Sequence, residues 1–168
     1  QSGSEQPTVS MGGGTVATRG DLPAGTKISK YVIKRLLGRG GMGAVYEAMD
    51  VALQRPVAMK VLPQSFVADE IALKRFVREA QLAARLQHPN VVTVFDVGKK
   101  GEIYFISMEL VRGRSAQEMV AKNGPMPYDD ASRCIADACR ALGAAHKAGL
   151  IHRDIKPDNI MIGEDGVV

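Results

Sequence analysis

Short runs of β-branched and apolar residues begin near residue 31 and alternate with glycine or proline along the first two thirds of the chain. Such runs are typical of short strands joined by turns. Five of them follow one another, at 31–38, 44–50, 56–62, 91–98 and 102–110. The last two flank a Lys99-Lys100-Gly101 turn, which predicts a hairpin. The pattern therefore predicts a five-stranded antiparallel sheet.

Apolar residues at helical spacing predict three helices. The first covers 69–87, ends before His88-Pro89, and places on one face Leu73, Phe76, Val77, Ala80, Ala83 and Ala84. A short helix is predicted at 116–122. A long one runs to Lys147 with Asp129 or Asp130 as its N-cap, and its apolar face holds Ile135, Ala138, Cys139, Leu142 and Ala145. Sheet and helices together predict an α+β fold.

Composition excludes several classes of protein. Hydrophobic residues make up 45% of the chain and charged residues 24%, which is ordinary for a globular domain. The net charge of +4 comes from basic residues spread among acidic ones, so no nucleic-acid partner is expected. Cys134 and Cys139 are expected to be small buried thiols. The sequence shows neither a membrane-spanning run nor a signal-peptide pattern, so a cytoplasmic location is expected.

A glycine cluster follows the first strand. Gly38, Gly40, Gly43 and Val45 occur in a G-x-G-x-x-G-x-V spacing. Glycines let backbone N–H groups approach phosphate oxygens, although they also form plain hairpin turns. A dinucleotide-binding fold would continue this motif as a helix, whereas the residues after Gly43 read as a strand. A glycine-rich hairpin of this kind is what covers the phosphates of ATP in some phosphotransferases.

Lys60 lies inside the apolar run Val57-Ala58-Met59-Lys60. An ammonium group that is buried without a partner costs several kcal/mol, so Lys60 needs an anion in the fold, in a ligand, or in both. Glu79, near the middle of the first predicted helix, is the candidate partner. The alternative is an edge-strand lysine that points into water.

The segment HRDIKPDNIMI, from His152 to Ile162, carries the most specific motif. Asp154 is suited to orient a hydroxyl group and accept its proton. Lys156 is suited to neutralise charge on a transferring phosphoryl group, and Asn159 to hold Mg²⁺. This order and spacing, after the two earlier motifs, is improbable for a random polar loop.

With these motifs the chain resembles the eukaryotic-type (Hanks-type) Ser/Thr protein kinase family over residues 31–168. GRGGMGAVYEAMD, RFVREAQLAARLQHPNVV and AHKAGLIHRDIKPDNIM are particularly similar to its bacterial branch. The resemblance implies ATP and Mg²⁺ as cofactors and a protein Ser or Thr as the phosphoryl acceptor. It implies that Lys60 binds the α- and β-phosphates, that Glu79 pairs with Lys60, that Asp154 is the catalytic base, and that Asn159 is a metal ligand.

The resemblance also implies the adenine site. Val45 and Ala58 would cover the base and Met161 would lie beneath it. The backbone from Glu109 to Val111 would form the hinge, and Met108 would be the gatekeeper. Arg153, beside Asp154, resembles the arginine with which some kinases bind a phosphorylated activation loop.

The resemblance divides the chain into three parts. Residues 1–27 are rich in Gly, Ser, Thr and Pro, hold few large apolar groups, and are expected to form a flexible tail. Residues 28–112 correspond to the kinase N-lobe, and residues 113–168 to a partial C-lobe that ends after the catalytic loop. The family's D-F-G aspartate would come after Val168, so the fragment is expected to be inactive.

Three explanations of that end are open: a polypeptide cut short for expression, a partial sequence, or a natural half completed by a partner. The apolar face of the long helix is expected to be exposed and to favour self-association. Membrane tethering is known in the bacterial branch, but this sequence shows no tether. Two other functions stay open: a non-catalytic nucleotide-binding regulatory module, and a small-molecule phosphotransferase of related fold.

Overall fold

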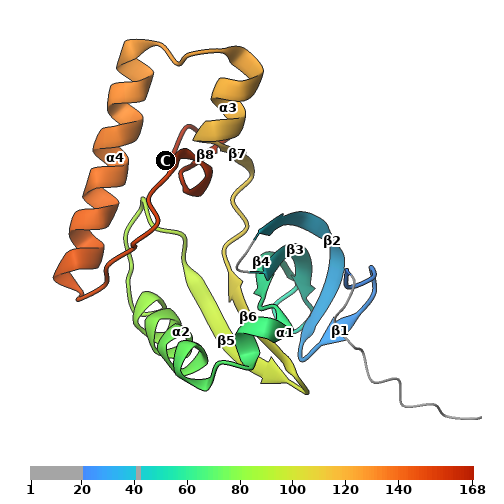
Figure 1. Cartoon of the computed structure of the whole chain (residues 1–168). Coiled ribbons are helices and arrows are strands. Elements are labelled where there is room, and N and C mark those ends of the chain that lie inside the picture. Colours follow the sequence, from blue (N-terminus) through green and yellow to red (C-terminus); the bar gives the residue numbers. More distant parts are fainter. Residues whose placement is uncertain (1–20, 41–42) are drawn as a thin grey trace, which may run out of the picture.

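A strongly curled antiparallel sheet forms the first half of the molecule, and two helices follow it at the other end (Figure 1). The computed structural model describes residues 21–40 and 43–168. The predicted tail falls largely on residues 1–20, which lie outside the described residues. Within the part of the chain that the structure describes, none of the helices combines the length and hydropathy needed to cross a membrane.

The sheet has six strands in the order β1-β2-β3-β4-β6-β5, and every pairing is antiparallel. Their bounds are β1 Lys27–Ile28, β2 Tyr31–Gly40, β3 Gly43–Asp50, β4 Arg55–Val61, β5 Val94–Lys100 and β6 Ile103–Met108. The five predicted strands are confirmed as β2 to β6.

Strand β1 was not expected, because residues up to 27 read as tail. Leu22 is buried at 5% exposure, and the Gly25 N–H donates to the Ile33 carbonyl over 2.8 Å. One large apolar side chain and a few backbone hydrogen bonds are enough to attach this segment to β2. The segment from Leu22 to Ile28 is therefore attached to the sheet.

Alternation along the strands separates two faces of the sheet. In β3 every second residue is buried: Ala44, Tyr46, Ala48 and Asp50. Successive side chains of a strand point to opposite faces, so these residues lie on the face that packs into the core. Val57, Met59 and Phe105 extend the core on the neighbouring strands. The other face of β3, which carries Val45, is less covered.

Polar contacts join distant strands across the interior of the curled sheet. The Tyr31 hydroxyl donates to Asp96 Oδ2 over 3.1 Å and accepts from Ser107 Oγ over 2.9 Å. Tyr31 and Ser107 are fully buried. At the two outermost strands, Lys100 Nζ donates to the Lys27 carbonyl over 3.2 Å. The ends of the sheet thus meet, as Figure 1 shows for β1, β2 and β5.

Two helices follow β4, α1 (Gln64–Val67) and α2 (Glu70–Ala83). Helix α2 confirms the predicted amphipathic helix but ends four residues earlier than expected. Beyond Ala83 the backbone turns more tightly, since the Leu86 N–H bonds to the Ala83 carbonyl three residues back. Helix α1 was missed, because four residues are too few to show a helical period.

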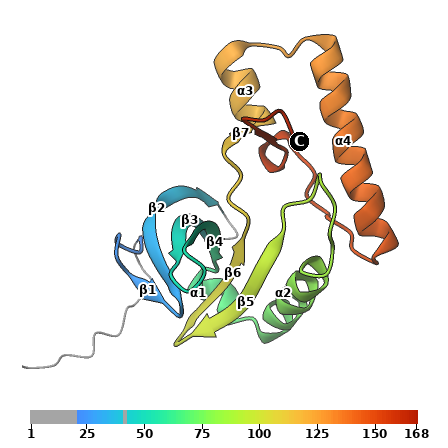
Figure 2. The same ribbon diagram turned by 180° about the vertical axis from the view of Figure 1, so that it is seen from behind.

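The C-terminal part contains β7 (Gly113–Ser115), α3 (Ala116–Asn123), α4 (Tyr128–Lys147), η1 (Pro157–Asn159) and β8 (Met161–Gly163). The two predicted helices are confirmed. In the view from behind, Figure 2 shows α4 above α2, with both helices on the same side of the molecule.

Two details of α4 were predicted wrongly. Its N-cap is Pro127, and Asp129 and Asp130 lie in the first turn, where carboxylates favour the helix dipole without capping it. Cys134 is the buried thiol and Cys139 is exposed. Cys134 and Cys139 are five residues apart, so their side chains differ in direction by more than a third of a turn around the helix axis. The two thiols therefore do not face the same side of α4.

Candidate active site

Four of the predicted binding residues share the face of the sheet that lies opposite the core. Val45 pairs with Lys60 across β3 and β4, and Ala58 pairs with Met108 across β4 and β6. Directly opposed residues in an antiparallel sheet point to the same face, and residues two apart in one strand do so as well. Val45, Ala58, Lys60 and Met108 are therefore neighbours on one surface, as the sequence predicts.

Glycines join β2 to β3 next to this surface. Gly38 pairs with Val45, and Gly40 pairs with Gly43. Gly43 has a φ of +113°, and a Cβ atom there would lie 2.1 Å from the Val61 carbonyl oxygen. Only glycine fits that position. The motif connects two strands, which confirms the predicted hairpin and excludes a helix after the last glycine.

Lys60 is half-buried, and this burial lowers the pKa of its ammonium group. The negative charge of Asp154 opposes the shift. Glu79, the expected partner, lies instead with its carboxylate 3.9 Å from Arg153 Nη1. Within residues 21–40 and 43–168, no ion pair joins Lys60 to Glu79. The expected pairing is absent because α2 directs Glu79, with its side chain 48% exposed, toward the catalytic loop.

The catalytic loop brings three predicted residues together. Lys156 Nζ lies 3.1 Å from Asp154 Oδ2. Asn159 Nδ2 donates to the Asp154 carbonyl over 2.7 Å and to Asp154 Oδ2 over 3.2 Å. The short helix η1 makes this possible, since it turns the chain directly after Lys156 and returns Asn159 to Asp154.

The same contacts set the charge state of Asp154. The hydrogen bond from Lys156 holds the pKa of the Asp154 carboxyl below its ordinary value, with a smaller contribution from Asn159. His152, which the sequence did not single out, accepts the Asp154 N–H at Nδ1 over 3.3 Å. Arg153 has a positive φ of 63°, which turns the backbone sharply between these two residues. Asp154 is therefore ionised and fixed in orientation.

The predicted hinge follows β6. The Glu109 N–H donates to the Thr93 carbonyl over 2.9 Å, and Glu109 Oε2 accepts the Thr93 N–H over 3.2 Å. These bonds attach the start of the hinge to the segment before β5. On the far side, Met161 in β8 pairs with Ser115 in β7. Since β7 follows the hinge in the chain, its pairing with β8 connects the hinge to Met161.

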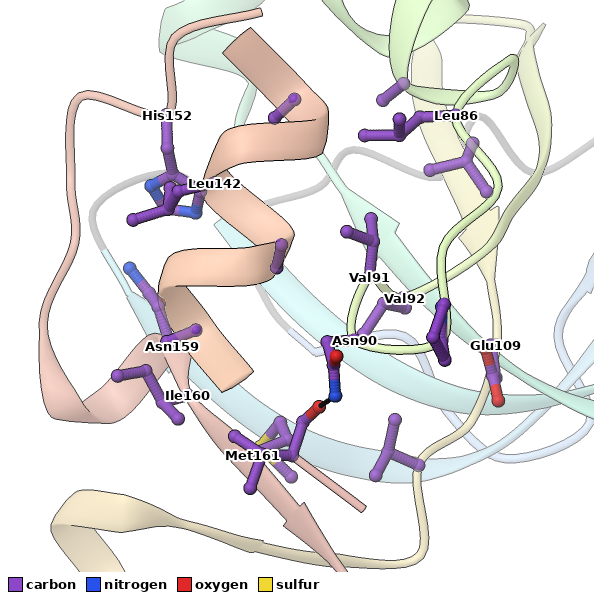
Figure 3. A pocket seen from close by; sticks show the side chains of 18 of the residues that line it. Leu86, Asn90, Val91, Val92, Glu109, Leu142, His152, Asn159, Ile160 and Met161 are labelled. Carbon is purple, nitrogen blue, oxygen red and sulfur yellow. Dashed lines mark hydrogen bonds between the residues drawn. The ribbon is translucent and has the colours of Figure 1, made fainter. Parts of the chain in front are cut away.

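A cavity of about 780 Å³ opens between α2, the hinge, α4 and the catalytic loop (Figure 3). Its lining includes five of the predicted site residues: Glu79, Glu109, Val111, Asn159 and Met161. Apolar side chains cover much of the rest, among them Phe76, Leu86, Leu142 and Ile160. Lys60 and the glycine hairpin lie outside this lining. The predicted residues thus form three groups: the sheet face with the glycine hairpin, the lining of the cavity, and Asp154 with Lys156 on the catalytic loop outside that lining.

Sequence patterns did not show the role of the apolar residues in that cavity. Leu142, for example, belongs to the apolar helix face that the sequence predicts to be exposed, and in the structure it lines this cavity. Helical spacing marks which residues share a face, but it does not show whether that face meets protein or an open cavity. Figure 3 places Leu142 beside His152 and across from Leu86.

Among the described residues, Asn159 is a candidate ligand for Mg²⁺. Both of its hydrogen bonds use the amide nitrogen, which leaves the amide oxygen as a donor to a hard cation. Mg²⁺ takes few protein ligands and completes its shell with phosphate oxygens and water. Among the described residues no group of three or more His, Cys, Asp or Glu could hold a metal. The donor set thus suits a metal that is shared with a phosphate.

The curled sheet, the lysine on its open face and the Asp-Lys-Asn loop are those of a protein kinase. The chain belongs to that family: a model described as the protein kinase domain matches residues 31–168. It is 41% identical over 151 residues to serine/threonine-protein kinase PknL of Mycobacterium tuberculosis, covering 90% of this chain and 38% of that protein. It is also 42% identical over 143 residues to PrkC of Bacillus subtilis, covering 84% of this chain and 22% of that protein.

Solved structures agree with this family. The crystal structure of the Mycobacterium tuberculosis PknI kinase domain matches with a TM-score of 0.81 at 32% identity. The match covers 88% of this chain and 60% of that one. The chain therefore has the fold of a bacterial Ser/Thr kinase domain and spans well under half the length of the curated relatives named above.

Proposed function

We propose that this chain supplies the ATP site and the catalytic loop of a Ser/Thr protein kinase. The complete domain would transfer the γ-phosphoryl group of ATP to Ser or Thr hydroxyls of proteins. The observation that carries the proposal is the cluster of Asp154, Lys156 and Asn159 on one loop, with side-chain and backbone contacts of 2.7 to 3.2 Å.

In the proposed reaction the acceptor hydroxyl oxygen forms a bond to the γ-phosphorus as the bond to the ADP oxygen breaks. Asp154 orients the hydroxyl and accepts its proton, for which its ionised state is required. Lys156 neutralises charge that develops on the transferring group. Bound Mg²⁺ would stabilise charge on the phosphates, and the amide oxygen of Asn159 would hold it.

Lys60 would bind the nonreacting phosphates. It lies on the sheet face beside Val45, next to the strand that leads from the glycine hairpin. Burial lowers the pKa of Lys60, because it disfavours the charged ammonium group. A phosphate would offset that cost by pairing with the charged form. The hydrogen bonds of the hinge backbone and the apolar contacts of Val45, Ala58 and Met161 would hold adenine.

The binding step is testable with the chain itself. Calorimetric titration with ATP and Mg²⁺ should show one site, and Lys60→Ala should weaken it. Lys122→Ala, an exposed lysine of α3, is the matched control and should bind as the wild type does. Equal binding by the Lys60→Ala and wild-type chains would contradict the assignment of Lys60.

We further propose that the 168 residues bind ATP without turnover. The chain covers 60% of the PknI kinase-domain structure, and in this proposal Asn159 is the metal ligand that it supplies. Phosphoryl transfer depends almost wholly on positioning and charge stabilisation, so a partial metal site is insufficient. Robust Mg²⁺-dependent phosphorylation of a generic protein substrate by this chain would refute the proposal.

A chimera tests the activity of the complete domain. It would continue from Val168 with the corresponding residues of Bacillus subtilis PrkC. Phosphorylation of a protein on Ser or Thr, abolished by Asp154→Asn, is the expected result. Nucleotide binding by a folded chimera without transfer would favour a regulatory module, and transfer to small molecules alone would favour a small-molecule phosphotransferase.

Self-association through α4 is part of the proposal. Tyr128 is 84% exposed and Ile135 is 57% exposed, two turns apart on this helix. Burial of such a surface against a second copy would remove apolar area from water. Sedimentation of the chain should show dimers at high concentration that Ile135→Glu removes. A monomer at every concentration would refute self-association.

A further inference from the structure

A two-stranded ribbon connects the hinge side of the site to the segment after the catalytic loop. Strands β7 and β8 pair through Gly113 with Gly163, Arg114 with Ile162, and Ser115 with Met161. Further hydrogen bonds continue the contact at both ends. The Glu164 N–H donates to the Arg112 carbonyl and the Ala116 N–H to the Ile160 carbonyl, each over 2.8 Å.

The ribbon is unusually close-packed at its glycine pair. A Cβ atom on Gly113 would lie 2.0 Å from the Ile162 carbonyl oxygen and 2.8 Å from the Gly163 Cα. Both obstacles are backbone atoms, which no rotamer change can move. Gly113 does not have a positive φ, so the need for glycine at this position comes from space alone. An alanine would force β7 away from β8.

The opposite glycine is also confined, but by a side chain. A Cβ on Gly163 would lie 2.4 Å from Asp165 Oδ1. That oxygen accepts the Val167 N–H over 3.1 Å, so the carboxylate could swing away at the loss of one exposed hydrogen bond. Substitution at Gly163 is therefore the milder perturbation of the same ribbon.

The ribbon lies next to the proposed adenine site on both strands. Gly113 follows Val111, the end of the hinge, by two residues, and Gly163 follows Met161 by two residues. Val111 and Met161 both line the cavity. The contact at Gly113 therefore holds the strand that follows the hinge against the strand that carries Met161.

The ribbon is also held at its far end, where α3 begins. Ser115 Oγ accepts the Glu118 N–H over 3.1 Å, and Glu118 Oε2 accepts the Ser115 N–H over 2.8 Å. This capping box fixes the direction in which the chain leaves β7. With both ends held, a displacement of β7 is transmitted to the hinge rather than absorbed by the connection to α3.

We propose that Gly113 is a positioning residue for ATP: its close approach to β8 sets the position of Met161, which would lie beneath the adenine, relative to the hinge. The inference rests on the proposed ATP site. Alanine at this position would separate the strands by about 1.5–2 Å, because a Cβ atom 2.0 Å from the Ile162 oxygen must move out to about 3.5–4.0 Å. A base held on both faces would lose contact, whereas phosphates near Lys60 would not.

The test compares two probes on the 168-residue chain. Adenosine reports the adenine site, and tripolyphosphate with Mg²⁺ reports the phosphate side. Gly113→Ala should weaken adenosine about tenfold, or about 1.4 kcal/mol, and leave tripolyphosphate unchanged. Gly143→Ala is the matched control, since a Cβ there meets nothing within 4 Å, and both affinities should stay as in the wild type.

Each other outcome has a distinct meaning. Unchanged adenosine affinity in Gly113→Ala would overturn the inference, and so would an equal loss of both probes, which indicates general structural damage. If Gly113→Ala does not fold, Gly163→Ala replaces it with the same expectation and a smaller loss, and unchanged binding would again overturn the inference. A wild-type chain that binds neither probe would refute the proposed ATP site itself.

Discussion

The carboxylate of Glu79 lies 3.9 Å from the guanidinium of Arg153, and this ion pair joins α2 to the catalytic loop. Both side chains are about half exposed or more, at 48% and 63%. Exposed ion pairs of this kind contribute about 0–1 kcal/mol, so the contact is easily exchanged. We expect Lys60, the partner that the kinase resemblance implies for Glu79, to compete with Arg153 for this carboxylate.

Removal of Arg153 should therefore change the electrostatics of Lys60. In Arg153→Gln, Glu79 loses its cation and becomes available to Lys60, so the pKa of Lys60 should rise above its wild-type value. NMR titration of ¹³C-labelled lysine, assigned with Lys60→Met, measures this pKa directly.

The control for that experiment is Arg133→Gln. Arg133 forms a similarly exposed pair with Asp130 on α4, at 3.1 Å, and its loss should leave the Lys60 titration as it was. Addition of Glu79→Gln to Arg153→Gln should abolish the rise. An unchanged Lys60 pKa in Arg153→Gln would show that Glu79 does not exchange between the two cations.

Burial of Lys60 predicts a dependence of stability on pH. Its folded-state pKa is lowered from 10.5, mainly by burial, so between the two values the unfolded chain binds more protons than the folded one. The contribution of Lys60 to the free energy of unfolding therefore rises with pH in this range. Lys60→Met should be more stable than the wild type at neutral pH, and the difference should narrow as pH approaches 10.5. Urea unfolding across this range measures it, and a constant or widening difference would contradict it.

The core face of β4 predicts a large loss of stability. Met59 is fully buried in the cluster that also contains Tyr46 and Val57. Met59→Ala should reduce the free energy of unfolding by about 2–5 kcal/mol, through lost burial and the cavity that remains. Leu53→Ala, at a position 58% exposed, should change it by less than about 0.5 kcal/mol. Similar losses in the two variants would place Met59 outside the core.

The buried hydroxyl of Tyr31 predicts a smaller but specific loss. Tyr31→Phe keeps the ring, which meets Phe105 edge-on at 5.7 Å, and removes the oxygen that Asp96 and Ser107 share. Leaving buried Ser107 without this partner should cost about 1–3 kcal/mol in chemical unfolding. The double variant Tyr31→Phe with Ser107→Ala should recover part of the loss, and additive losses would contradict the shared hydrogen bond.

Most of the fold was predictable because its signals are local. Period-two alternation marks the strands, and the apolar face from Leu73 to Ala84 marks α2. The missed elements, among them α1 and β1 with four and two residues, are short and depend on contacts made elsewhere in the fold. Leu22 illustrates this, since a single buried residue in a polar segment has no pattern around it.

The site was predictable only within continuous motifs. Asp154, Lys156 and Asn159 are held by a loop of six residues, so their spacing implies their contact. Glu79 and Arg153 lie far apart in sequence, and their contact depends on how α2 is oriented. Sequence spacing identifies the carboxylate, but not which of two cations it contacts.

The bonds that join the two ends of the sheet affect how the sheet opens. Tyr31 bonds to Asp96, 65 residues further along the chain, and Lys100 bonds back to Lys27, 73 residues away. An open sheet can fray strand by strand from its outer edges, whereas here each edge is tied to the other. Backbone amides of β2 and β5 should therefore open to solvent together, in one cooperative unit that also carries Lys60 and the glycine hairpin.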